Sequence, residues 1–130
     1  MNYKPRQRDI VILDFEPSKG YEVRKRRPAL VLSKDTYNSA TNLIIVCPIT
    51  TSDKERPFLV PVQSDNLKTN VEKISKVNTL QVFSLDYTKQ ANRNVKYIDT
   101  LDEEVFFDIA QRFLKIFPFL FRGCEKSALA

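Results

Sequence analysis

The residue types best suited to chemistry in this sequence lie in one basic run, Arg24-Lys25-Arg26-Arg27, which Pro28 and an apolar stretch follow at once. Arginine holds phosphate oxygens with a planar fork of donors. Glu22 lies two residues before the run and Lys19 a little earlier. A carboxylate and several guanidinium groups so close in sequence can converge on one phosphodiester. The same run would also suit a solvated loop or a nuclear localisation signal.

Within the run, Arg27 differs from its neighbours because it adjoins Pro28 and the apolar residues 29–32. Apolar, β-branched runs of this kind favour a strand. A side chain held by a strand is placed more rigidly than one in a loop. We therefore expect Arg27 to be the fixed phosphate ligand, and Arg24, Lys25 and Arg26 to attract backbone phosphates in a salt-dependent way.

A second candidate cluster is a run of three hydroxyls, Thr50-Thr51-Ser52, at the end of a long apolar segment, 43–49. Side chains that a rigid strand presents at its end often bind ligands. Hydroxyl clusters are also typical of ordinary turns, and taken alone this cluster favours that interpretation. Farther along, Gln81 carries an amide edge that can read a base, although an isolated glutamine in a strand is usually only solvated.

The overall charge points to an anionic partner. The chain has 130 residues, 21 lysines and arginines against 16 acidic residues, and a net charge of +5. Lys4, Arg6 and Arg8 form a further basic cluster near the N-terminus. Such a balance favours nucleic acid, although many small basic proteins carry it for solubility alone. The two basic clusters could line one groove.

Several classes of site are disfavoured by what the sequence lacks. It has no histidine and only two cysteines, Cys47 and Cys124, without metal-ligand spacing. We therefore expect no metal and no cofactor, and Cys47 to be a core residue because it lies in an apolar run. No apolar run is long enough to span a membrane and the N-terminus has no apolar leader segment, so we expect no membrane partner and a cytoplasmic protein.

The elements that must position these side chains are short strands and one helix. We expect strands at 9–15, 28–33, 43–49, 58–62, 71–77, 79–85 and 95–99, and a single helical turn at 35–40. Pro61 predicts an edge strand at 58–62, because proline cannot donate to a sheet ladder. Thr100 and Glu103 form a capping-box pattern that predicts a helix over 100–117, which Pro118 ends.

This set of elements predicts a mainly β fold of the α+β class. Six or seven short strands with one terminal helix favour a strongly twisted antiparallel sheet, curled into a small, partly open barrel with the helix on one side. We expect one domain over 1–130. Its parts would be a basic N-terminal arm at 1–8, a mobile basic loop at 16–27, the helix at 100–117 and a tail at 118–130.

An ordered set of motifs resembles the MazF/PemK toxins. The motifs are Asp9-Ile10-Val11, Asp14-Phe15-x-Pro17-x-x-Gly20-x-Glu22, Arg27-Pro28-Ala29-Leu30-Val31-Leu32-Ser33, Tyr37-Asn38, Val46-Cys47-Pro48-Ile49-Thr50-Thr51 and Pro57-Phe58-x-Val60-x-Val62. The resemblance runs from about Arg8 through the C-terminal helix and is most specific before Val62. It implies the SH3-like barrel that these toxins share with CcdB.

The resemblance also implies a function. It suggests the toxin of a type II toxin–antitoxin system, a metal-independent, sequence-specific endoribonuclease that cleaves single-stranded RNA. Such a toxin would be a homodimer, silenced by a cognate antitoxin with an acidic disordered tail, in a complex that binds DNA. Carried over residue by residue, the catalytic candidates are Arg27, Thr50 and Glu22, and Gln81 matches a strand glutamine near the substrate. The full set of RNA-binding candidates is Arg8, Lys19, Arg24, Lys25, Arg26, Thr51, Ser52 and Gln81.

The sequence departs from the family pattern at five positions. Arg8 stands where the family usually has glycine, Val23 replaces a glutamine, and Phe83 replaces a basic residue. Asn78 and Leu80 stand where PemK-type members have an arginine and an acid. The departures at Leu80 and Phe83 leave open a non-catalytic RNA-binding module of the same fold. A second alternative is a gyrase-poisoning toxin of the CcdB kind, which is similar in fold.

Overall fold

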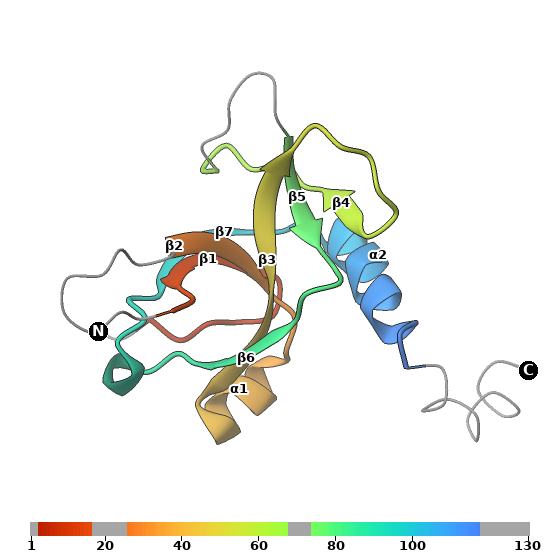
Figure 1. Ribbon diagram of the computed structural model, residues 1–130. Helices are drawn as coiled ribbons and strands as arrows, with labels where there is room; N and C mark the ends of the chain where they lie inside the picture. The colour runs from red at the N-terminus through yellow and green to blue at the C-terminus, as the bar shows by residue number, and fades with distance from the viewer. Residues whose placement is uncertain (1–2, 17–25, 68–73, 118–130) are drawn as a thin grey trace, which may run out of the picture.

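The computed structural model describes residues 3–16, 26–67 and 74–117, and Figure 1 shows their arrangement. The elements in chain order are β1 (Asp9–Asp14), β2 (Arg26–Val31), α1 (Asp35–Thr41), β3 (Leu43–Ser52), β4 (Leu59–Pro61), β5 (Ile74–Asn78), β6 (Phe83–Asp86), the 3₁₀ turn η1 (Lys89–Ala91), β7 (Lys96–Thr100) and α2 (Glu103–Leu114). The strands form one seven-stranded sheet in the order β4-β5-β3-β2-β1-β7, with β6 paired to β3. Every pairing is antiparallel and the sheet does not close, which confirms the expected partly open barrel.

β3 is the longest strand and joins the two parts of the sheet, running through the whole fold in Figure 1. Its first half pairs with β6, its middle with β2, and its last four residues, 49–52, with β5. Both faces of β3 are also covered, because Cys47 and Ile49 belong to one hydrophobic cluster and Ile44 and Val46 to another. The residues of a strand covered on both faces read as a continuous apolar run, which explains the composition of β3. β4 pairs only with β5, so Pro61 does lie on an edge strand.

Two hydrophobic clusters cover the two faces of the sheet. Adjacent residues of one strand alternate between them: Ile10 belongs to one cluster and Val11 to the other, and Leu30 and Val31 divide in the same way. This alternation is the two-residue period of a strand. α2 packs on the first cluster through Phe106 and Ile109, which confirms that the helix covers one side of the sheet.

The start of α2 differs from the expected capping box. Thr100 is the last residue of β7, and the N-cap is Asp102, whose carboxylate accepts from the amides of Glu104 and Val105. Aspartate is a preferred N-cap, because its oxygen satisfies amides that lack a partner in the first turn. Two acids in the first turn, Glu103 and Glu104, add a favourable interaction with the helix dipole.

The other differences between the expected and the observed elements lie at the ends of strands. The expected strand at 28–33 begins earlier, because Arg26 and Arg27 already belong to β2 and not to the loop. The expected strand at 79–85 is wrong in its first half: residues 79–82 form a turn and β6 begins at Phe83. The side chain of Asn78 accepts a hydrogen bond from the amide of Leu80. Such a bond from an asparagine side chain to the backbone two residues on is typical of a turn.

The structure bears on two further expectations, one about Cys47 and one about membrane-spanning segments. Cys47 is fully buried, as expected, and burial raises the pKa of its thiol to about 12. Neither helix in the described parts of the chain has the length and apolar character needed to cross a membrane.

Asn38, the buried asparagine of α1, belongs to a hydrogen-bonded cluster that connects four segments of the chain. Asn38 is 1% exposed; its side chain donates to the carbonyls of Pro5 and Ser33 and accepts from the Ser33 hydroxyl. Its backbone carbonyl accepts from the hydroxyl of Tyr87. The Ser33 hydroxyl in turn accepts from the amide of Ile45. The polar atoms of this cluster are thus satisfied internally, so that removing one leaves its partners without a hydrogen bond.

Replacing Asn38 with alanine should therefore lower the free energy of unfolding by about 1–3 kcal/mol, because the Pro5 and Ser33 groups lose their partner. Urea denaturation measures the effect. Ser39→Ala, on the exposed face of the same helix, is the matched control and should change stability by less than about 0.5 kcal/mol. Equal stability of the two variants would contradict a structural role for Asn38.

Candidate phosphate-binding site

A pocket of about 550 Å³ opens where β2 and β3 separate, and it contains the two residues that the sequence analysis favoured. We call it the Arg27–Thr50 pocket. Its lining residues come from five strands and from the loop after β4: Ile12, Arg27, Pro28, Ile49, Thr50, Thr51, Asn66, Leu67, Ser75 and Ile98. Arg27 is exposed and Thr50 is half-buried. Strand residues form most of the wall, so the site is part of the sheet itself.

Pro28 explains why the two strands part at this point. The amide of Leu32 donates to the carbonyl of Ile45 at 2.8 Å. In an antiparallel pair, hydrogen-bonded positions recur every second residue. Given the register Leu30–Cys47, the next such position joins residue 28 to Ile49. Proline has no N–H to donate, and the β2–β3 pairing accordingly ends at Ala29 and Pro48.

The same register places Arg27 and Thr50 on one face. Ala29 lies opposite Pro48, and residues two apart on a strand project to the same side. Arg27 therefore shares a face with Ala29, and Thr50 shares that face with Pro48. Because the strands have separated here, the guanidinium and the hydroxyl border open space instead of packing against each other.

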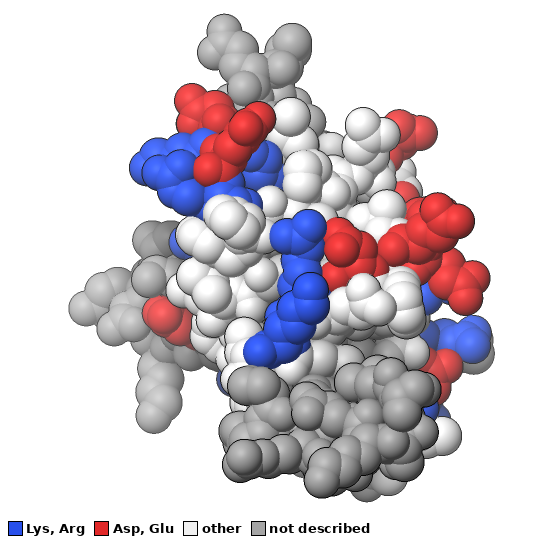
Figure 2. All heavy atoms as spheres, turned by 90° about the vertical axis from the view of Figure 1, so that its right-hand side faces the viewer, with Lys and Arg blue, Asp and Glu red and all other residues white. Residues whose placement is uncertain are grey.

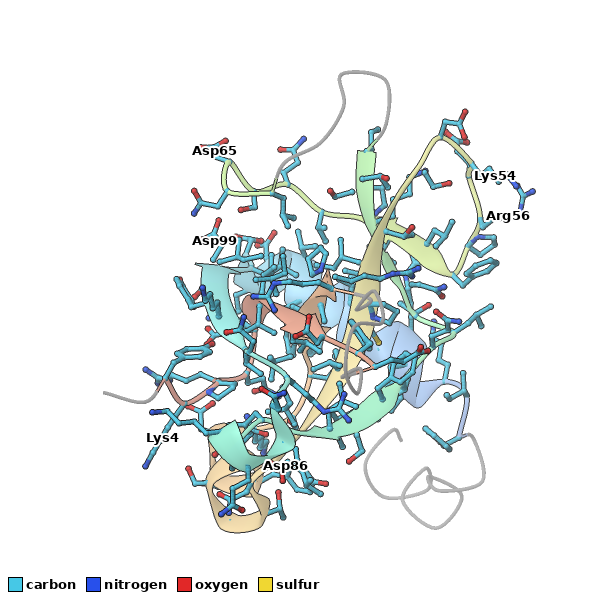
Figure 3. The ribbon with its side chains drawn as sticks, turned by 60° about the vertical axis from the view of Figure 1, so that its left-hand side comes forward. Lys4, Lys54, Arg56, Asp65, Asp86 and Asp99 are labelled. Carbon is cyan, nitrogen blue, oxygen red and sulfur yellow. The ribbon has the colours of Figure 1, made fainter. Side chains whose placement is uncertain are left out.

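The far wall of the pocket is fixed by hydrogen bonds between the loop after β4 and β7. The side-chain amide of Asn66 donates to the carbonyl of Ile98 at 3.0 Å. The hydroxyl of Ser64 donates to the carboxylate of Asp99, and this bond, followed by one from the amide of Thr100, lowers the pKa of Asp99. Figure 3 shows Asp65 and Asp99 on the same side of the molecule, where this loop meets the strand.

The lining residues define what the pocket can bind. Among the described residues that line it, Arg27 carries the only charge, and hydroxyls of Thr50, Thr51 and Ser75 and the amide of Asn66 supply neutral hydrogen-bonding groups. One guanidinium with several hydroxyls suits an oxyanion, since charge-assisted bonds from arginine are strong and directional. Ile12, Ile49 and Ile98 give the pocket an apolar floor on which a flat ring can rest.

Three residues of this region are not among the candidates predicted from the sequence. Ser75 and Asn66 line the pocket, and Lys76 lies directly opposite Thr50 on β5. Residues directly opposite in an antiparallel pair project to the same face, so Lys76 and Thr50 are side-by-side neighbours. No motif marks these three residues, because their proximity depends on the pairing of β5 with β3.

Arg26 is engaged elsewhere in the fold. It lies opposite Asp14 in the β1–β2 pairing, and its guanidinium contacts the carboxylate of Asp14 at 3.4 Å. The Asp14 side chain is only 3% exposed, so this pair is a largely internal one. Asp14 therefore competes with the backbone phosphates that Arg26 is expected to attract.

Of the other expected RNA ligands that the structure describes, only Thr51 lines the Arg27–Thr50 pocket. Arg8 borders a different pocket, of about 820 Å³, and its Nε donates to the carbonyl of Leu101 at 3.0 Å. The Ser52 hydroxyl accepts from the amide of Lys54, which is ordinary turn chemistry. Gln81 is exposed in the β5–β6 turn and does not line the pocket, so its expected place on a strand is wrong, while its contact with RNA stays a prediction.

Several expectations concern residues that the structure does not describe. Lys19, Glu22, Arg24 and Lys25 lie outside the described ranges, as does Cys124. Within the described ranges, no group of three or more histidine, cysteine or acidic side chains could hold a metal ion.

On the face of the molecule that Figure 2 shows, the charge of the described residues is mixed and does not form one basic groove. On the α2 side, which faces the reader in Figure 2, blue and red side chains are interspersed over a largely uncharged surface. Arg6 is paired with Asp35 at 3.1 Å, and Arg112 with Asp108 at 3.3 Å. Among the described members of the two basic clusters, Arg6 and Arg8 border the pocket of about 820 Å³ and Arg27 borders the Arg27–Thr50 pocket.

Comparison with protein families gives a match over residues 6–117, to the PemK-like, MazF-like toxins of type II toxin–antitoxin systems. Among curated proteins, the endoribonuclease toxin MazF of Escherichia coli K12 is 43% identical over 58 residues. That match covers 45% of this chain and 52% of the E. coli protein, so the chain spans about half the length of the curated relative it matches.

Solved structures match over a longer stretch. A crystal structure of MazE–MazF from Deinococcus radiodurans has a TM-score of 0.72 and 29% identity, with 90% of this chain and 98% of that chain covered. A mycobacterial endoribonuclease has a TM-score of 0.65 at 16% identity, covering 89% of this chain and 93% of that one, which shows likeness of fold.

Replacing Pro28 with alanine should extend the β2–β3 pairing by one position, because residue 28 then gains an N–H directed at the Ile49 carbonyl. The new amide at position 28 should be protected from hydrogen exchange, as measured by NMR. Pro57→Ala, in the exposed segment before β4, is the control and should give an unprotected amide. Rapid exchange of the new amide at position 28 would show that something other than proline separates the strands.

Proposed function

Because this chain belongs to the PemK-like, MazF-like toxins of type II toxin–antitoxin systems, we propose that it is an endoribonuclease that cuts single-stranded RNA without a metal ion. The sequence-specific cleavage would occur in the Arg27–Thr50 pocket. The observation that carries the proposal is the joint presence of an exposed guanidinium and a half-buried hydroxyl in that pocket. In the described residues Arg27 has no ion-pair partner, so it is available to a phosphate.

The chemistry that fits this pocket is attack by the ribose 2′-oxygen on the adjacent phosphorus. The new O2′–P bond forms as the P–O5′ bond breaks, leaving a 2′,3′-cyclic phosphate and a free 5′-hydroxyl. The proton of the 2′-hydroxyl passes to a base, and the departing 5′-oxygen takes up a proton. RNA supplies its own nucleophile on this route, so the protein has to position and stabilise charge.

Each residue has a role in that step. Arg27 binds the non-bridging oxygens and stabilises the charge that builds up on them in the transition state. Thr50 donates to the phosphate or the 2′-oxygen and fixes the angle of attack. We assign the base to Glu22, which adjoins the basic run and lies outside the described residues. Thr51 contacts the neighbouring nucleotide from the same pocket.

The Arg27–Thr50 pocket and the basic run at 24–27 also suggest which partners the protein binds. Single-stranded RNA suits the pocket, because its bases can be splayed out onto apolar side chains such as Ile12 and Ile98. We propose an antitoxin with an acidic disordered tail as the inhibitor, since such a tail can bind the basic run at 24–27 and fold as it does so. The toxin would be a cytoplasmic homodimer, and its complex with the antitoxin would bind DNA.

Replacing Arg27 with alanine should lower the rate of RNA cleavage by at least about 100-fold, because the transition-state charge loses its main partner. Cleavage of a defined single-stranded RNA in the presence of a chelator measures it. Arg56→Ala, an exposed arginine of the β3–β4 segment, is the matched control and should cut at the wild-type rate. Equal cleavage by the two variants would end the assignment of Arg27.

The same assay separates the two alternatives. A non-catalytic binding module would bind the RNA without producing fragments with defined ends, and a gyrase-poisoning toxin would inhibit DNA supercoiling and leave RNA intact. Phe83, whose basic counterpart is missing here, packs edge-to-face on Phe15 with ring centroids 5.0 Å apart. This contact gives Phe83 a structural role, and neither Phe83 nor Phe15 lines the Arg27–Thr50 pocket.

An acidic tail and RNA should compete, because both use the basic run and the pocket beside it. In a fluorescence titration with a non-cleavable 2′-deoxy oligonucleotide, an acidic antitoxin peptide should displace the oligonucleotide. The effect should weaken as salt rises, since both ligands bind through ionic contacts. A neutral peptide of the same length is the control, and simultaneous binding of peptide and oligonucleotide would contradict the proposal.

A further inference from the structure

Lys76 is a nearly buried lysine beside the proposed catalytic threonine. Its residue is 4% exposed, and it lies in the middle of β5, opposite Thr50 on one side and Pro61 on the other. In the described residues it makes no ion pair. Its ammonium donates to one neutral group, the backbone carbonyl of Lys54. A cation so placed costs free energy, which an apolar side chain of similar length would not.

The bond from Lys76 acts on the end of β3. The carbonyl of Lys54 accepts from Lys76, and the amide of Lys54 donates to the Ser52 hydroxyl at 3.0 Å. Both backbone groups of Lys54, just past the strand end, are therefore held. Figure 3 shows Lys54 and Arg56 on the segment that joins β3 to β4, at the outer edge of the molecule.

Residues 49–52 of β3 depend on this restraint because β2 no longer pairs with this part of the strand. β2 pairs with β3 only as far as Pro48, and beyond that point β5 is the strand that pairs with β3. A strand end with one edge free is less constrained than one paired on both edges. Thr50 lies in this half-paired part, and the geometry of its hydroxyl depends on how firmly the end is held.

We propose that Lys76 is a positioning residue of the Arg27–Thr50 pocket: by binding the Lys54 carbonyl it fixes the end of β3 and with it the Thr50 hydroxyl. The inference rests on the proposed ribonuclease function. It explains why a buried cation is kept beside the pocket. It also gives Ser52 a role, as the second restraint on the same turn.

The test is steady-state cleavage of a defined single-stranded RNA by Lys76→Met and Lys76→Gln, with Lys54→Gln as the matched control. Lys54→Gln removes one positive charge but keeps the carbonyl that Lys76 binds. We expect kcat to fall about tenfold in both Lys76 variants, with KM changed less than about twofold. Lys76→Arg, which can still donate to the carbonyl, should recover most of kcat, and Lys54→Gln should cut as the wild type does.

Three results would overturn the inference. The first is an unchanged kcat in both Lys76 variants. The second is an equal loss in Lys54→Gln, which would indicate a general effect of charge. The third is a loss of kcat that matches the unfolded fraction in thermal denaturation and that arginine does not rescue, which would indicate a structural role alone. A wild-type protein that cuts no RNA would instead refute the proposed function, and hydrogen exchange at residues 50–54 would still report whether Lys76 restrains the strand end.

Discussion

The missing N–H of one proline determines the shape of the candidate site. Pro28 stands at the position of β2 where the next hydrogen bond to β3 would form, and the pairing ends there. Had it continued, Arg27 and Thr50 would be cross-strand neighbours in a closed ladder. Because it stops, the guanidinium and the hydroxyl keep the common face that the register gives them and border a pocket. The sheet thus sets both their alignment and their separation.

Strand alternation gives two adjacent arginines different tasks. Arg26 faces Asp14 across the β1–β2 pairing and neutralises a carboxylate that is nearly buried. Arg27, one residue on, projects to the other face and is exposed at the pocket. A buried carboxylate is costly unless it is paired, so Arg26 serves the fold while Arg27 is available to a ligand. The two-residue period alone makes this division.

Local patterns in the sequence predicted the strands and the helix. The positions of several individual side chains depend instead on pairing between strands that are far apart in the sequence. The apolar run at 43–49 and the apolar face of α2 were readable because each is a property of one segment. Gln81 and Lys76 could not be placed in this way, since their positions follow from where β5 ends and which residues of β3 it faces. Arg8 has φ of 79°, a conformation that favours glycine, which is the residue that the resembling family usually has at this position.

The charge of the chain is informative only after the pairs are known. A net charge of +5 suggests a broad cationic surface, but Arg6, Arg26 and Arg112 are each paired with an aspartate. What remains near the pocket, among the described residues, is one exposed guanidinium and, on the same face of the sheet, one buried ammonium. One guanidinium fixed at a set position stabilises charge on a phosphate better than a larger number of mobile charges in water, because a fixed group need not reorganise as charge develops. Selectivity for a reacting phosphate would then depend on sheet register more than on overall charge.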